Sequence, residues 1–205
     1  MLSEALAIRR LVDWPTAASW TTLIAEERLD PVRDAFHENG AQGPEVVWNP
    51  IPSEAYAPPI SALLDYWRTL RNGGALPRSD KIDPLCMRRA LGYVLLVDAV
   101  DNGRDFRYRL FGSAVAAVSG FDMTGKLLSE HGASAYLREF ALALYRASMH
   151  RRESVFCTYA PSGTVMTAHW QRVALPLTDH AGAINRFLAG SVPIGRDGRV
   201  VTVRI

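Results

Sequence analysis

The chain has 205 residues, of which 48 % are hydrophobic and 21 % are charged, and its formal net charge is +2. These values are typical of a globular protein with one main core, and the balanced charge gives no indication of a nucleic-acid or membrane partner. No apolar run reaches the about 20 residues that span a bilayer, and the N-terminus lacks the basic start and apolar core of a signal peptide. The two cysteines, Cys86 and Cys157, are far apart, which favours a reduced, cytoplasmic protein but leaves a single disulfide open.

Residues 1–57 differ in pattern from the rest of the chain. We expect two short helices there, at about residues 2–12 and 17–39, because proline interrupts the helical pattern. Residues 44–59 carry five prolines and are predicted to be an extended linker. A clearer helix follows Pro59 and stops at Gly73–Gly74. Its apolar residues share one face: Ile60, Leu63, Leu64, Trp67 and Leu70.

The pattern then changes to that of a β-hairpin. Residues 94–100 (VLLVDAV) form a short apolar run typical of a buried strand. Asn102–Gly103 predicts a turn, and residues 106–111 (FRYRLF) alternate as in a half-buried antiparallel strand. We expect Phe106, Tyr108 and Leu110 to face the core, with Arg107 and Arg109 in solvent.

Two helices and three strands complete the predicted order. The sequence GSAVAAVSGF indicates a short helix closed by Gly120, and residues 134–152 indicate a longer one. Residues 153–160, 164–177 and 184–194 are predicted strands, which pair most simply as a meander. The last residues, VVTVRI, suggest one more short strand.

This order of elements resembles a PAS domain, an α+β fold with a five-stranded antiparallel sheet, helices on one face and a small pocket between them. The resemblance extends to sequence pieces of a bacterial, mainly proteobacterial, stand-alone PAS family over about residues 60–194. It implies an N-terminal segment at 1–57, a sensor domain at 58–195 and a tail at 196–205. The matching pieces are YWRTLRNGG, LPRSDKIDP, YVLLVDAV, DFRYRLFGSAV, GFDMTGK, RVALPLTD and INRFLAG.

The resemblance implies sensing or docking rather than catalysis. PAS domains bind small ligands or partner proteins, so we expect a small apolar ligand, and a histidine kinase or another PAS protein as partner. Because we recognise no output domain, the chain is expected to act through such a partner or as a homodimer. The resemblance does not specify a cofactor.

Seven residues are predicted to contact a ligand, because PAS pockets are lined by aromatic and apolar side chains of this kind. Plain core packing explains at least half of them equally well, and His169 is more simply a strand histidine with satisfied hydrogen bonds. Cys157 is best explained as a buried, inert thiol. The candidate ligand-binding residues are Tyr108, Phe111, Met123, Phe140, Tyr159, His169 and Trp170.

No catalytic or metal-binding pattern is apparent, since the histidines lack metal-pair spacing and no nucleophile–base pair can be identified. Two other functions stay open. One is a binding-cup enzyme of the nuclear-transport-factor-like or ketosteroid-isomerase type, which needs a buried Asp or His–Asp pair. The other is a structural dimerisation module, in which residues 1–57 would pack across a partner subunit. In that case we expect deletion of residues 1–57 to weaken dimerisation. The predicted seam residues are Leu6, Leu11, Trp14, Trp20, Leu23 and Ile24.

Overall fold

The computed structural model describes residues 12–71, 74–163 and 167–202. Its helices are α1 (Trp14–Ala25), α2 (Asp30–Glu38), α3 (Pro58–Thr69), α4 (Ser113–Ser119) and α5 (Ala135–Arg151). Its strands are β1 (Gln42–Trp48), β2 (Val94–Val100), β3 (Asp105–Phe111), β4 (Val155–Ala160), β5 (His169–Thr178) and β6 (Ile184–Ile194). Short 3₁₀ turns occupy Ser79–Lys81, Pro84–Ala90, Asp101–Gly103 and Leu128–Glu130.

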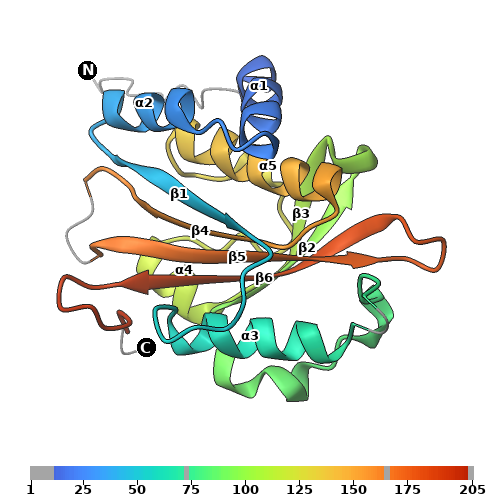
Figure 1. The fold of residues 1–205 in the computed structure, drawn as a ribbon. Helices are drawn as coiled ribbons and strands as arrows, with labels where there is room; N and C mark the ends of the chain where they lie inside the picture. Colours follow the sequence, from blue (N-terminus) through green and yellow to red (C-terminus); the bar gives the residue numbers. More distant parts are fainter. Residues whose placement is uncertain (1–11, 72–73, 164–166, 203–205) are drawn as a thin grey trace, which may run out of the picture.

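The strands form one antiparallel sheet in the order β1-β4-β5-β6-β2-β3 (Figure 1). Strands β4, β5 and β6 pair in succession as the predicted meander, and β2 and β3 form the predicted hairpin. The α+β class with an antiparallel sheet is therefore confirmed. The sheet has six strands rather than the expected five, because β1 adds a strand that the sequence did not indicate.

Helices cover both faces of this sheet, rather than the single face expected from the sequence. Successive side chains of a strand point to opposite faces, and β5 shows the division clearly. Trp170 and Ala174 belong to the core cluster that includes α5, while Val173 and Leu175 belong to the cluster that includes α3. Figure 1 shows α1, α2 and α5 on one side of the sheet and α3 on the other.

Helix α3 lies directly against the sheet. Its predicted apolar face is confirmed for Ile60, Leu63 and Leu64, which are fully buried, and for Trp67. The fifth predicted residue, Leu70, follows the end of the helix and is half-buried. The indole Nε1 of Trp67 donates a hydrogen bond to the carbonyl oxygen of Pro176 on β5, at 3.1 Å. This bond satisfies a buried donor, so the tryptophan both fills the core and fixes the helix on the strand.

The prediction of a linker over residues 44–59 is wrong for its first part. Residues Gln42–Trp48 form β1, in which Val46 pairs with Cys157 of β4. Pro44 is compatible with this strand because β1 is at the edge of the sheet, where one side needs no ladder hydrogen bonds. The number of prolines in this segment therefore indicated a linker where the chain forms an edge strand.

The N-terminal helices pack onto their own chain. Trp20 and Ile24 of α1 are buried in the same core cluster as α5, and Trp14 and Leu23 pack against it. Trp20 and Ile24 are therefore covered within the monomer and are not free to form the predicted dimer seam. Trp14 and Leu23 stay half-buried, so a seam through them remains a prediction, and Leu6 and Leu11 lie outside the described residues. The predicted helix at 17–39 is divided into α1 and α2. The predicted helix at 2–12 lies outside the described residues except for Val12, which is not helical.

A β-bulge corrects one detail of the hairpin. The register shifts between Leu96 and Val97, so that Leu96 pairs with Leu110 and Val97 with Tyr108. The extra residue reverses the alternation of faces. Phe106 and Tyr108 are buried as predicted, but Leu110 is 45 % exposed.

The C-terminal elements agree with the pattern, with shorter bounds for one strand. β6 has the predicted limits, whereas β5 begins at His169, and Thr164–Met166 of the predicted strand lie outside the described residues. Near the end, Val200 forms an isolated antiparallel bridge with Ile194, and residues 203–205 are not described. None of the helices in the described ranges has the length and hydropathy needed to cross a bilayer.

Candidate ligand-binding cavity

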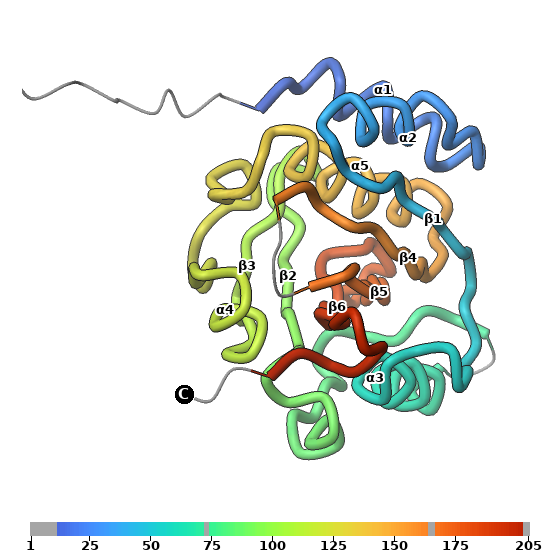
Figure 2. The backbone as a smooth tube through the Cα atoms, turned by 90° about the vertical axis from the view of Figure 1, so that its left-hand side faces the viewer, coloured from blue at the N-terminus to red at the C-terminus, as the bar shows by residue number. Residues whose placement is uncertain are grey.

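A cavity of about 510 Å³ lies between the sheet, α4 and the first turn of α5. This volume is in the range of cavities that hold small molecules. In Figure 2, α4 stands beside β2 and β3, next to the segment that leads into α5. The cavity is lined by Phe111, Val115, Val118, Ser119, Phe121, His131, Gly132, Ala133, Ser134, Leu137, Tyr159, Pro161, Ser162, Thr167, Trp170, Arg172 and Ser191.

Three of the seven predicted ligand residues, Phe111, Tyr159 and Trp170, line this cavity. Tyr108 and Phe140 are buried behind it, with ring centroids 5.3 Å from Phe111 and 5.8 Å from Tyr159. Tyr108 and Phe140 do not belong to the lining. Two other predicted residues are also absent from it: Met123, which is buried, and His169, which is half-buried on β5. The structure therefore brings the aromatic residues into one region, and their contact with a ligand stays a prediction.

The polar residues of the lining, chiefly Arg172, Ser191 and His131, were not among the predicted ligand residues. Arg172 on β5 pairs with Ser191 on β6 and with Cys157 on β4. Arg172 follows Trp170 by two residues, so its side chain leaves the same face of the sheet. An arginine inside an otherwise buried strand was the signal that could have identified it.

The guanidinium of Arg172 makes no ion pair with any described residue. Its Nε is shielded from solvent and has no hydrogen-bond acceptor among the described residues. The Oγ of Ser191 is likewise buried without a partner there. The guanidinium carbon of Arg172 lies 5.6 Å from the centroid of the Tyr159 ring.

The hydroxyl and thiol groups around Arg172 carry no negative charge at neutral pH. Burial raises the pKa of Tyr108 to about 12 and that of Cys157 to about 12, although the charge of Arg172 partly opposes both shifts. Burial also raises the pKa of Tyr159 and of Tyr145. Because all four groups remain protonated, none of them neutralises the guanidinium.

His131 contributes a neutral donor to the cavity. Its Nδ1 accepts a hydrogen bond from the backbone N–H of Ala133 at 3.1 Å, so the neutral ring carries its proton on Nε2. Burial, and then the charges of Arg172 and Arg138, lower the pKa of His131 to about 3. The ring is therefore uncharged at physiological pH.

The remaining histidines and the cysteines show no catalytic or metal-binding arrangement. Within the part of the chain that the structure describes, no three His, Cys, Asp or Glu side chains gather to hold a metal ion. Cys86 is exposed and Cys157 is fully buried, and both are free thiols. The disulfide that the sequence left open is therefore not formed.

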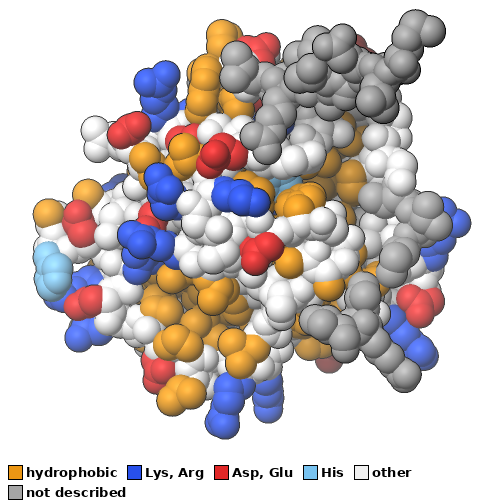
Figure 3. Space-filling view, turned by 180° about the vertical axis from the view of Figure 1, so that it is seen from behind, with side chains coloured by type: hydrophobic (Ala, Val, Ile, Leu, Met, Phe, Trp, Pro, Cys, Tyr) orange, Lys and Arg blue, Asp and Glu red, His pale blue; other side chains and the backbone are white. Residues whose placement is uncertain are grey.

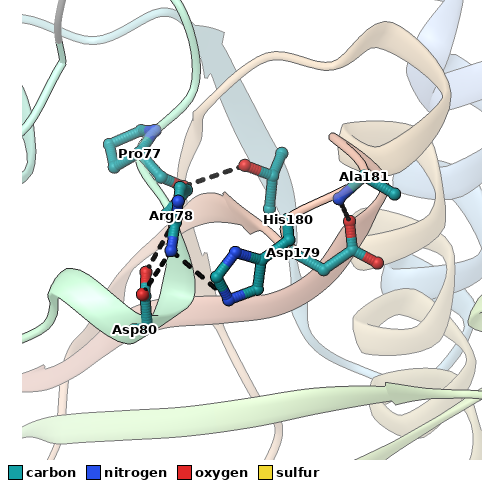
Figure 4. A network of polar contacts seen from close by, with 7 residues as sticks. Pro77, Arg78, Asp80, Asp179, His180 and Ala181 are labelled. Carbon is teal, nitrogen blue, oxygen red and sulfur yellow. Dashed lines mark hydrogen bonds and ion pairs between the residues drawn. The ribbon is translucent and has the colours of Figure 1, made fainter.

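Two of the sequence pieces that carried the resemblance meet at the C-terminal end of β5, at residues that do not line the cavity (Figure 4). Thr178 N donates to the carbonyl oxygen of Pro77 at 2.9 Å, which joins LPRSDKIDP to the end of RVALPLTD. Arg78 Nε donates to Asp80 Oδ1 at 3.0 Å, and Arg78 Nη2 lies 3.3 Å from His180 Nε2. These contacts fix the loop after α3 on β5, so this motif has a structural role.

A family model described as a PAS domain matches residues 56–192. The chain belongs to the PAS domain family. Every lining residue of the cavity in this PAS domain falls within the matched range, whereas α1, α2 and β1 precede it. No curated protein and no solved structure matches the chain.

Proposed function

We propose that this PAS domain is a cytoplasmic sensory or regulatory module that binds a small molecule in the cavity at α4 and signals its occupancy to a partner, such as a histidine kinase or another PAS protein. The observation that carries the proposal is the cavity of about 510 Å³, lined mainly by apolar and aromatic side chains on the α5 side of the sheet. Such a site buries most of the surface of a small ligand. The free thiols at Cys86 and Cys157 are in keeping with a reducing compartment.

The binding-cup enzyme receives no support from the lining. That reaction type needs a carboxylate in the cup, as a base or paired with a histidine. The described lining residues include neither Asp nor Glu. Binding without chemical conversion is therefore the function that these side chains favour.

Two variants of α4 test the binding function. Val118 lines the cavity, and Ala117 precedes it on the same helix without lining it. We expect Val118→Trp to fill the cavity and to abolish binding of a copurified or added molecule, measured by native mass spectrometry and by thermal shift. Ala117→Trp is the matched control and should bind as wild type does; equal binding by both variants would contradict the proposal.

A further inference from the structure

The cavity contains a positive charge for which the described part of the chain supplies no anionic partner. An enclosed charge is costly unless it is paired. Arg172 has no ion pair there, and its Nε and the Oγ of the opposing Ser191 have no hydrogen-bond partner. Guanidinium groups stay protonated in proteins, so Arg172 cannot escape this cost by losing its charge.

The buried carboxylates of the described residues are already engaged elsewhere. Asp105 Oδ1 accepts hydrogen bonds from the backbone N–H groups of Phe106, at 2.7 Å, and Ser129, at 3.3 Å. Glu139 Oε1 accepts from the backbone N–H of Asp13 at 3.1 Å. Neither residue lines the cavity.

The other polar groups near Arg172 also favour a negative ligand. The proton of His131 is on Nε2, so this ring can donate to an acceptor in the cavity. Arg138 is buried beside it and donates from Nη1 to the carbonyl oxygen of His131 at 3.2 Å. A recess of about 40 Å³, bordered by both Arg138 and Arg172, shares His131 and Tyr159 with the main cavity.

Most of the remaining lining of the cavity is apolar. Phe111, Val115 and Val118 belong to its lining, as do Phe121 and Leu137. Figure 3 shows the molecule from behind, where patches of hydrophobic side chains lie between the charged ones. The site thus combines a cationic end with an apolar body.

We propose that the ligand of this cavity is a small organic carboxylate, whose anionic group pairs with Arg172 and accepts hydrogen bonds from Ser191 and His131, while its apolar part lies against α4. This inference rests on the proposed function and specifies the class of ligand. The planar fork of arginine suits the two oxygens of a carboxylate. A neutral apolar molecule would fill the same volume but leave Arg172 without a counterion.

The test compares matched acids and amides. Benzoate, phenylacetate, hexanoate and octanoate are titrated against the full-length chain by calorimetry and thermal shift, each beside its neutral amide. We expect acids to bind more tightly than their amides, and Arg172→Met to weaken acid binding by at least about 30-fold. Arg172→Lys keeps the charge but not the fork and should give an intermediate affinity, and Ser191→Ala should weaken binding by about 3- to 10-fold.

The outcomes separate this inference from the function on which it rests. The carboxylate proposal is overturned if no acid binds better than its amide, or if Arg172→Met retains the preference for acids. If amides then bind as well as acids and Val118→Trp blocks both, the cavity is still a ligand site. If neither acids nor amides bind to the folded wild-type chain, the carboxylate proposal fails, and a chain that also carries no copurified molecule contradicts the binding function.

Discussion

Arg172 and Ser191 lie directly opposite each other on β5 and β6, and both point polar atoms without a protein partner at the same cavity. Central strands of a sheet that is covered on both faces are expected to be apolar. Two unsatisfied groups at adjacent positions are costly to the folded state, since each buried unpaired donor destabilises it by about 1–3 kcal/mol. Such a cost at paired positions of two central strands, next to a cavity, is typical of a functional site.

The first prediction concerns the destabilisation of the ligand-free protein by the unpaired charge of Arg172. We expect Arg172→Met to raise the free energy of unfolding by about 1 kcal/mol, because methionine fills similar space without an unpaired charge. The corresponding rise in Tm is about 2–4 °C. Urea and thermal unfolding of protein freed from ligand measure both quantities.

Arg186→Met is the control for this substitution. Arg186 Nε donates to Asp98 Oδ1 at 2.6 Å, so its loss leaves a largely buried carboxylate with one partner fewer. We expect this variant to be less stable than wild type by about 1 kcal/mol. Destabilisation of the same size by Arg172→Met would indicate that Arg172 has a structural partner.

The second prediction concerns the pH dependence of stability. The pKa of His131 is about 3 in the folded chain, compared with an ordinary value of 6.5. Between these values the unfolded chain binds a proton that the folded chain does not, so acid favours unfolding. The contribution of His131 is fully present above pH 6.5 and falls as the pH decreases towards 3, by up to about 1.4 kcal/mol per pH unit.

A comparison with His131→Gln isolates this contribution from the carboxylates. The free energy of unfolding is measured for both proteins by urea denaturation from pH 7.5 to pH 4. We expect the wild type to lose stability more steeply than the variant below pH 6.5. Parallel profiles would show that His131 is accessible to protons in the folded state.

The third prediction concerns the N-terminal segment. Phe36 on α2 is fully buried, and its ring meets those of Tyr136, Phe140 and Tyr159 edge-on at 4.9, 5.3 and 6.2 Å. We expect Phe36→Ala to destabilise the chain by about 3–5 kcal/mol, as for other buried aromatic residues. Unfolding followed by circular dichroism measures the loss.

Ile51→Ala is the control in the same segment, because Ile51 is 65 % exposed. This change should alter stability by no more than about 0.5 kcal/mol. If Phe36→Ala changes the free energy of unfolding as little as Ile51→Ala does, the N-terminal helices contribute little to the stability of the fold.

Phe36→Ala should also weaken ligand binding, because the ring of Phe36 packs against Tyr159, which lines the cavity.

The fourth prediction concerns the bend between β3 and α4. A Cβ at Gly112 would lie 2.2 Å from the carbonyl oxygen of Gly92, which accepts hydrogen bonds from the N–H groups of Ala114 and Val115. Gly112 has an ordinary φ of −54°, so close approach rather than backbone freedom requires glycine here. We expect Gly112→Ala to cost about 3 kcal/mol or more.

Gly132→Ala is the matched control, since a Cβ there meets no atom within 4 Å. It should unfold at nearly the wild-type temperature. Equal stability of the two alanine variants would mean that the backbone at Gly92 moves freely to accept the methyl group.

The sequence predicted those elements whose pattern is local. β2, β6 and α3 were found because apolar periodicity and flanking turn residues mark them. β1 was missed because its partner is β4, far along the chain, and because Pro44 resembles a linker residue. The exposed Leu110 was missed because the bulge that displaces it depends on pairing with β2.

The cavity was predicted in part for a similar reason. Aromatic residues such as Tyr159 and Trp170 are recognisable as pocket or core candidates from their type. The proposed role of Arg172 depends on the absence of an acidic side chain beside it among the described residues. A single sequence does not show which acidic side chains lie near a given arginine. His131 lies in a loop without periodicity, so only the fold places it at the cavity.

The pairing of Trp48 with Val155 has a consequence for how the chain is made. During synthesis on a ribosome, β1 emerges long before β4. Until β4 is made, the backbone N–H and C=O groups of β1 that pair with it remain without their partners. Long-range strand pairing of this kind slows folding and leaves nascent edges open to wrong partners. We therefore expect the sheet to close only after most of the chain has left the exit tunnel, with α1 and α2 docking onto α5 in the same late step.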